Sequence, residues 1–228
     1  MIEFVFLDMD DTLLDFHAAE IGGLRKTLSQ VGLEPTPEVL GRFHVINEAQ
    51  WKKLETGELT RAQVKLRRFE LLFEEFGVDC DAERARVLYE QILSEGHIFL
   101  EGAEKLLADL HEKYKLYIVS NGTSSVQRGR IASAGFAPLF EGIFLSEDVG
   151  FVKPQKEFFD VCFGTIPNFS RERSIILGDS LTSDILGGIN AGIRTCWFNP
   201  HGKTGREDIR PDFEISALSQ FPALVEQL

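Results

Sequence analysis

Short apolar runs that alternate with helix-like segments constrain the fold of this 228-residue chain more than any other feature. Strands are predicted near residues 3–8, 116–119, 143–145, 174–177 and 195–198, with a short edge strand at 213–215. Helices are predicted near residues 102–113, 123–134, 155–165, 183–191 and 217–227. Strands that alternate with helices of this length form parallel crossover units. The predicted fold class is therefore α/β, with a doubly wound parallel sheet.

Residues 17–96 interrupt this alternation with a purely helical pattern. Apolar residues recur at helical spacing throughout the segment, and no run has the character of a strand. Thr36 and Thr60 are typical helix starts, and Gly32 and Gly77 are typical helix ends. We therefore predict a catalytic core formed by residues 1–16 and 97–228, with residues 17–96 inserted as a helical cap. An insert placed just after a strand end can cover a site there and exclude water.

Acidic residues follow the first predicted strand at once. Residues 4–7 are apolar, and Asp8, Asp10 and Asp11 come directly after them. In open α/β sheets, ligands bind at the carboxyl ends of the strands. Because carboxylates this close repel one another, a hard divalent cation such as Mg²⁺ is the expected counter-charge. The alternative is a helix cap by Asp10, Asp11 or Thr12, which would explain one acid but not three.

Three more polar clusters follow later predicted strands. Ser120 and Asn121 follow the second strand, Lys153 follows the third, and Asp179 with Asp184 follow the fourth. Each has a structural alternative: Ser120 and Asn121 could cap a turn, Asp184 could cap the next helix, and Lys153 could be a solvated surface residue. Four such clusters at the ends of strands in one sheet indicate a single site instead.

The four clusters resemble the motifs of the haloacid dehalogenase-like (HAD) hydrolase superfamily. Residues 8–12, Asp-Met-Asp-Asp-Thr, match its first motif, and residues 119–122, Val-Ser-Asn-Gly, match its second. Residues 152–154, Val-Lys-Pro, match the third, and residues 178–184, Gly-Asp-Ser-Leu-Thr-Ser-Asp, match the fourth. The order is the same and the matches cover the Rossmann-like core. The helical insert is similar to the cap of the superfamily's first cap class (C1).

The resemblance implies a Mg²⁺-dependent phosphatase that works through an aspartyl-phosphate. Asp8 would be the nucleophile, and Asp10 would be the general acid and then the general base. An acid two residues after the nucleophile marks the phosphatases and phosphomutases of the superfamily. Asp11 would have no catalytic role.

The same resemblance implies a metal site and a phosphate site. The Asp8 carboxylate, the Asp10 carbonyl oxygen and Asp179 would hold Mg²⁺, and Asp184 would hold a metal-bound water in preference to the metal itself. Lys153, Ser120 and Asn121 would bind the phosphoryl oxygens, with Lys153 counted among the catalytic residues as well. These three are the residues of the second and third motifs.

Further segments resemble the pyrimidine 5′-nucleotidase (YjjG-type) branch of the superfamily. They are residues 14–20, residues 47–61, residues 121–122 with Gln127 and Arg130, and residues 190–192 with 197–200. The substrate would then be a small phosphate ester, namely UMP, dUMP or dTMP. Three alternatives stay open: a phosphatase for phosphoglycolate or sugar phosphates, a phosphomutase, and a non-enzymatic phosphoacceptor or binding module.

The net charge and the cysteine content limit which partners and which cellular compartment are expected. The formal net charge is −12 and the isoelectric point is about 4.9, which argues against nucleic acid or an anionic membrane as partner. Cys80, Cys162 and Cys196 are widely spaced and odd in number, so reduced thiols are expected. No signal-like segment or membrane-spanning run occurs, so we expect a soluble cytoplasmic protein. The sequence leaves monomer and dimer open. Trp51 and Phe69 are expected in the core of the cap.

Overall fold

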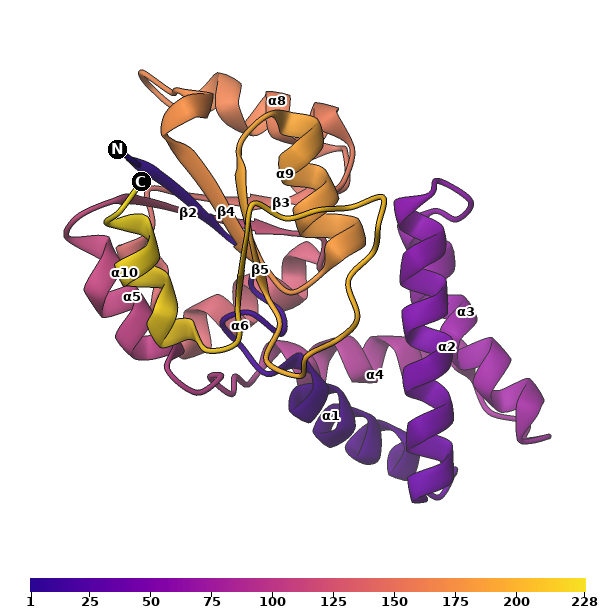
Figure 1. The fold of residues 1–228 in the computed structure, drawn as a ribbon. Coiled ribbons are helices and arrows are strands. Elements are labelled where there is room, and N and C mark those ends of the chain that lie inside the picture. The colour runs from indigo at the N-terminus through magenta and orange to yellow at the C-terminus, as the bar shows by residue number, and fades with distance from the viewer.

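The central sheet has six parallel strands in a computed structural model that describes residues 1–228. The strands are β1 (Phe4–Leu7), β2 (Lys115–Ser120), β3 (Gly142–Leu145), β4 (Ser174–Gly178), β5 (Arg194–Phe198) and β6 (Phe213–Ile215). Their order in the sheet is β3-β2-β1-β4-β5-β6 (Figure 1). This order places the first strand at the centre, with later strands added outward on both sides. The predicted doubly wound α/β fold is confirmed.

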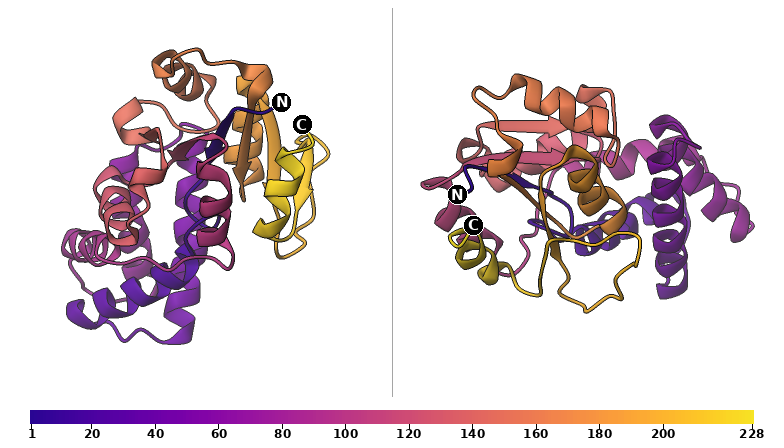
Figure 2. Two further views of the ribbon diagram at one scale, coloured as in Figure 1. Left: turned by 90° about the vertical axis from the view of Figure 1, so that its left-hand side faces the viewer. Right: turned by 45° about the horizontal axis from the view of Figure 1, so that its top comes forward.

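Helices cover both faces of the sheet. They are α5 (Ala103–His111), α6 (Ser124–Ala134), α7 (Ser146–Val149), α8 (Lys156–Thr165), α9 (Leu186–Ala191) and α10 (Phe221–Val225). Buried apolar residues of α5 and α10, with Ile131 of α6, belong to one apolar cluster, and those of α8 and α9 belong to another on the opposite face. Figure 2 shows these two layers on either side of the sheet. The chain termini lie near each other on the core.

β1 shows why the strand residues had to be apolar. Val5 and Leu7 pack in the cluster on one face, and Phe4 and Phe6 pack in the cluster on the other. All four are fully buried because side chains alternate between the two covered faces. Polar residues can begin only where the strand leaves the sheet, which is at Asp8.

Four helices form the inserted cap and stand apart from the layers of the core (Figure 1). They are α1 (Phe16–Val31), α2 (Pro37–Glu55), α3 (Arg61–Glu75) and α4 (Ala82–Ser94). Most buried residues of a separate apolar cluster of 14 come from these helices. Thr36 and Thr60 are the N-caps of α2 and α3, as predicted, and Gly32 ends α1 with a φ of +87°. The helical insert is confirmed.

Two predicted helices differ from those observed. The helix expected at 217–227 is a 3₁₀ turn at Leu218–Gln220 followed by the single short helix α10. Pro222 lacks an N–H group and therefore limits the hydrogen bonds at this start. The helix expected at 183–191 begins as a π-helical turn at Leu181–Ile185 before α9. No helix is long and apolar enough to cross a membrane.

Candidate active site

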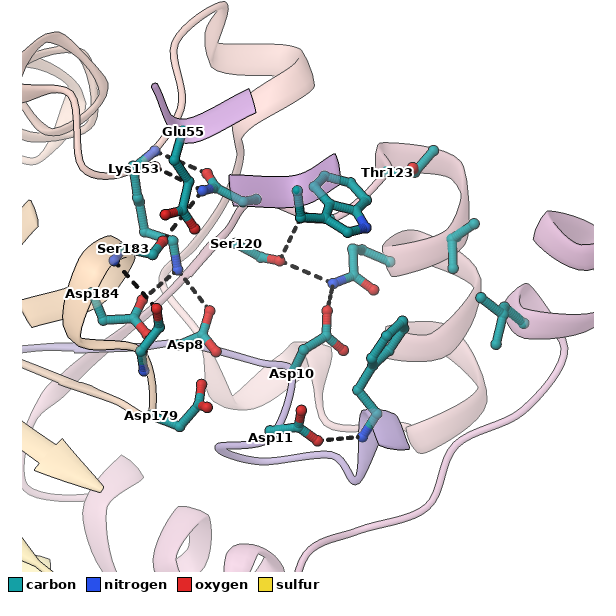
Figure 3. A pocket seen from close by; sticks show the side chains of 18 of the residues that line it. Asp8, Asp10, Asp11, Glu55, Ser120, Thr123, Lys153, Asp179, Ser183 and Asp184 are labelled. Carbon is teal, nitrogen blue, oxygen red and sulfur yellow. Dashed lines mark hydrogen bonds and ion pairs between the residues drawn. The ribbon is translucent and has the colours of Figure 1, made fainter. Parts of the chain in front are cut away.

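The polar residues at the strand ends meet in one cavity between the sheet and the cap. Asp8 follows β1, Ser120 ends β2, and Asp179 follows β4, so parallel strand ends bring them together. The cavity has a volume of about 210 Å³ and is lined by 20 residues of both the core and the cap. Figure 3 shows the acidic side chains and Lys153 pointing toward one another. All predicted site residues, including Asn121 and Asp184, line this cavity.

Lys153 lies at the centre of the acidic cluster. Its Nζ donates hydrogen bonds to Asp8 Oδ1 at 2.6 Å, to Asp184 Oδ1 at 2.7 Å and to the Val119 carbonyl oxygen at 2.7 Å. Only 1% of the residue is exposed. Burial lowers the pKa of Lys153, but the carboxylates of Asp184 and Asp8 outweigh this and raise it above its ordinary value. The alternative of a solvated surface lysine is wrong.

One lysine does not balance the acids around it. Carboxylate oxygens of Asp8, Asp179 and Asp184 lie within 4.8 Å of one another. The pKa of Asp8 is raised to about 8, because burial and the charge of Asp184 outweigh the opposing effect of Lys153. Burial also raises the pKa of Asp179 well above its ordinary value, with Asp184 adding to the effect. Lys153 alone therefore supplies too little positive charge for all three carboxyls to be ionised together.

This donor set fits a hard divalent cation. Carboxylate oxygens are the ligands that Mg²⁺ takes in proteins. The Asp179 carboxylate makes no hydrogen bond, and its nearest cation is Lys203 Nζ at 3.9 Å. It is thus available as a ligand, while Asp184 is held at both oxygens, by Lys153 and by the Ser180 N–H at 3.1 Å. The residues present fit the predicted Mg²⁺.

Asp10 is held by two residues of α6. Gln127 Nε2 donates to Asp10 Oδ2 at 2.6 Å, and the guanidinium of Arg130 pairs with Asp10 Oδ1. Arg130 is fully buried, and its Nη1 also donates to Gln127 Oε1 at 3.2 Å. The sequence singled out Gln127 and Arg130 only as features of the nucleotidase branch. Their spacing of three residues places both side chains on one helix face, which indicates that they can contact the same partner. In the structure that partner is Asp10.

Asn121 and Ser120 are tied into the loops around Lys153 and Asp10. Asn121 Nδ2 donates to the Lys153 carbonyl oxygen at 2.8 Å, and the Lys153 N–H donates to Asn121 Oδ1 at 2.9 Å. Ser120 Oγ accepts from Gly122 N–H at 3.0 Å and from Gln127 Nε2 at 2.9 Å. The turn-capping alternative thus describes part of what Ser120 does. The Asn121 side chain fixes the loop that carries Lys153.

Asp11 caps the start of the insert. Its Oδ1 accepts hydrogen bonds from the Phe16 N–H at 2.9 Å and from the His17 N–H at 3.3 Å. Its backbone has a φ of +55°, a conformation that Asp tolerates better than most residues. The capping role considered for this acid therefore describes what it does in the structure.

The cap contributes lining residues that the sequence did not reveal. Glu55 of α2 reaches into the cavity (Figure 3), and burial raises its pKa. Trp51 also lines the cavity, so placing it in the core of the cap was wrong, whereas Phe69 is fully buried there as expected. Arg61 of α3 donates to the Asn121 carbonyl oxygen and to Ser146 Oγ, which joins the cap to the core. Helical periodicity separates inside from outside but does not show which polar residues face the core domain.

Gly178, the last residue of β4, leaves room for Asp184. A Cβ built on Gly178 would lie 2.3 Å from Asp184 Cγ, closer than real contacts allow. We expect Gly178→Ala to displace Asp184 from Lys153 and to lower catalytic activity at this site by about 10²-fold, on the scale of losing one preorganised charge contact. Steady-state rates with Mg²⁺ would measure this. Gly164→Ala, where the added carbon meets nothing within 4 Å, is the matched control and should retain wild-type activity.

The sheet order, the helical insert and the cavity between them define a doubly wound α/β protein whose acidic site is covered by a helical cap. A crystal structure of YfnB from Bacillus subtilis bound to magnesium superposes with a TM-score of 0.94. The two chains are 40% identical, and the match covers 98% of each.

A family model described as haloacid dehalogenase-like hydrolase matches residues 2–192. The chain is 41% identical over 216 residues to YfnB, which is named as a HAD-hydrolase, covering 95% of this chain and 92% of that protein. The chain is 36% identical to the pyrimidine 5′-nucleotidase PynA of Streptococcus pneumoniae, and the match covers 93% of this chain and 90% of PynA. It is 31% identical to the pyrimidine 5′-nucleotidase YjjG of Escherichia coli, and the match covers 98% of this chain and 97% of YjjG. The chain belongs to the haloacid dehalogenase-like hydrolases and is a HAD phosphatase with a helical cap.

Proposed function

We propose that the chain is a Mg²⁺-dependent 5′-nucleotidase that hydrolyses pyrimidine nucleoside monophosphates such as UMP, dUMP and dTMP. The observation that carries the proposal is the meeting of Asp8, Asp10 and Lys153 with the acidic triad in one cavity beneath the cap. The names of the relatives PynA and YjjG support the choice of substrate. Residues 17–96 act as the cap in this proposal, and residues 1–16 and 97–228 form the catalytic core.

Asp8 is the proposed nucleophile. Its Oδ1 accepts from Lys153 Nζ and its Oδ2 accepts from Thr12 Oγ1 at 3.3 Å, so the carboxylate is held in a fixed orientation. An Asp8 oxygen bonds to phosphorus while the bond from phosphorus to the ester oxygen breaks. Asp10 gives a proton to the departing 5′-oxygen of the nucleoside. The products of this half-reaction are the nucleoside and an aspartyl-phosphate on Asp8.

Water completes the cycle. Asp10, now a carboxylate, takes a proton from a water molecule that bonds to phosphorus, and the bond from phosphorus to Asp8 breaks. Inorganic phosphate leaves and both aspartates return to their starting states. Gln127 and Arg130 hold Asp10 in place for both proton transfers. Lys153, Ser120 and Asn121 are the proposed partners of the phosphoryl oxygens, which carry the charge in phosphoryl transfer.

The metal ligands are proposed from the donor set described above. The Asp8 and Asp179 carboxylates and the Asp10 backbone carbonyl would hold Mg²⁺, and Asp184 would act through a water. Bound Mg²⁺ supplies positive charge that offsets the repulsion between the acids and an incoming phosphate. The two hydrogen bonds to the Asp184 oxygens are consistent with this outer position.

Removing the metal should abolish activity and lower stability. EDTA should reduce phosphate release to background, and excess Mg²⁺ should restore it. Because Mg²⁺ binds the folded acids and not the unfolded chain, a concentration of 100 times its Kd should stabilise the fold by about 2.7 kcal/mol. Thermal unfolding with and without Mg²⁺ measures this, and Asp179→Asn should weaken the Mg²⁺ effect. Full activity in EDTA would contradict the proposed site.

A substrate panel tests the proposed function. Phosphate release with Mg²⁺ should be measured for UMP, dUMP, dTMP, AMP, phosphoglycolate and hexose phosphates. We expect the pyrimidine monophosphates to have a kcat/KM at least about tenfold higher than the others, a difference of about 1.4 kcal/mol in transition-state binding. A preference for phosphoglycolate or a sugar phosphate would leave the mechanism standing and reject the nucleotide substrate. Phosphate retained in an isomer of the substrate would indicate a phosphomutase.

A further inference from the structure

The cavity does not stop at the catalytic acids. It continues between the cap helices, where Arg68 of α3 and Glu90 of α4 line it together with Leu93. Neither charged residue belongs to the proposed phosphoryl-transfer machinery. One cavity therefore joins the phosphate end at Asp8 to a second polar end formed by a guanidinium and a carboxylate.

Arg68 presents an unused donor at this second end. The residue is 3% exposed. Its Nε donates to the Lys65 carbonyl oxygen at 3.2 Å, and its Nη1 donates to Asn47 Oδ1 at 3.1 Å. Nη2 makes no hydrogen bond to the protein. Because a buried guanidinium usually has its N–H groups paired, the remaining donor is suited to an acceptor on a bound molecule.

Glu90 presents an unused acceptor. Its Oε2 is paired with Lys65 Nζ at 3.0 Å and with Arg86 Nη1 at 3.1 Å. Its Oε1 is buried and has no hydrogen-bond partner. A buried carboxylate oxygen without a donor is costly unless a ligand supplies one. The polar end of the cavity thus offers one donor and one acceptor.

Aromatic side chains also line this cavity. Phe16 and Trp51 both border the cavity, beside Val126. Trp51 is fixed by a hydrogen bond from its Nε1 to Asn47 Oδ1 at 3.1 Å. Such side chains suit a flat heterocycle, because a base presents apolar π-faces.

We propose that Arg68 and Glu90 recognise the imide edge of a uracil or thymine base, an assignment that rests on the proposed nucleotidase function. Arg68 Nη2 donates to a ring carbonyl oxygen, and Glu90 Oε1 accepts from the ring N3–H. Uracil and thymine place these two groups side by side. In the same position cytosine presents the lone pair of its N3, which the Glu90 carboxylate repels. The pair therefore selects uracil and thymine over cytosine.

The competing explanation is that both residues only stabilise the cap. Arg68 lies over the rings of Phe69 and Tyr89 at 5.4 and 4.8 Å, and Glu90 joins Lys65 to Arg86. A stabilising role would affect every substrate alike, including ribose 5-phosphate, which has no base. Recognition of the base would change only the ratios between substrates.

Glu90→Gln tests the assignment. An amide can accept from the N3–H of uracil or donate to the N3 of cytosine, so it should no longer discriminate. We expect wild-type kcat/KM to be at least about tenfold higher for UMP than for CMP, and the variant to reduce this ratio by about fivefold or more. The kcat/KM of the variant for ribose 5-phosphate should stay within twofold of wild type, which corresponds to a change of about 0.4 kcal/mol in transition-state binding. Glu83 also pairs with Arg86 but does not line the cavity, so Glu83→Gln is the matched control.

A second probe does not depend on any variant. UMP that carries a methyl group on N3 lacks the donor for Glu90, so wild-type kcat/KM should fall by about tenfold or more relative to UMP. Equal rates on UMP, CMP and the methylated nucleotide would overturn the assignment of Arg68 and Glu90, as would a parallel loss on all substrates in Glu90→Gln. Either result would leave the proposed nucleotidase function standing. A wild-type enzyme that hydrolyses UMP no faster than ribose 5-phosphate would overturn the proposed nucleotidase function as well.

Discussion

Asp8→Asn is expected to lower phosphate release from UMP by at least about 10⁴-fold, the scale of removing an enzyme's nucleophile. An amide oxygen is too weak a nucleophile to attack phosphorus. The fold should persist, because asparagine has nearly the same shape and its Oδ1 can still accept from Lys153 Nζ. The substitution also removes one of three crowded acids.

Initial rates with Mg²⁺ and a thermal unfolding curve would measure the two effects separately. Asp15→Asn is the matched control, because Asp15 caps α1 through the Ala18 N–H at 2.8 Å and asparagine caps equally well. The control should keep wild-type activity. A folded Asp8→Asn variant with more than about a hundredth of wild-type activity, a loss of less than 2.7 kcal/mol, would remove Asp8 as the nucleophile.

Lys153→Met should impair both activity and stability. The substitution leaves Asp8 and Asp184 buried without their shared cation and leaves the Val119 carbonyl oxygen without its donor. Removing one partner of a buried ion pair lowers the free energy of unfolding by about 3–5 kcal/mol. Loss of a charge that stabilises the phosphoryl group lowers kcat by about 10²–10³-fold. Mg²⁺ should recover part of the stability, because it supplies positive charge to the same acids.

Lys156→Met provides the comparison for a surface lysine. Lys156 pairs with Asp160 at 2.5 Å one helical turn away, and its side chain is more than half exposed. Such a pair contributes at most about 1 kcal/mol, so the variant should unfold close to the wild-type temperature and remain active. Equal stability of the two variants, measured by chemical denaturation in EDTA, would contradict the central position of Lys153.

The fold was predictable because its signals are local. A parallel strand buried on both faces is mostly apolar, so β1 and β4 stand out in the sequence, and Asp8 and Asp179 mark the points where they leave the sheet. The acidic cluster was predictable for the same reason. Its residues follow strands whose ends necessarily meet at one edge.

The contacts of the cap were less predictable because they depend on side-chain direction. Arg68 shares the buried face of α3 with Val64 and Leu72, but spacing alone does not show that aromatic rings of the cap enclose its charge. The large apolar side chain of Trp51 favours a position in the core of the cap, but it borders the cavity. Arg61 contacts the Asn121 carbonyl oxygen, 60 positions away in the chain. Such pairings arise from the docking of two domains, which periodicity does not encode.

The most direct test of the account is to trap the phosphoryl group on Asp8. The wild-type enzyme should carry the aspartyl-phosphate during turnover, because phosphoryl transfer to Asp8 precedes the attack of water. Rapid acid quenching during reaction with UMP, followed by mass spectrometry of the peptide that contains Asp8, should show one added phosphoryl group. An Asp8→Asn variant should show none. Turnover of UMP without any phosphoryl group on that peptide would contradict the account.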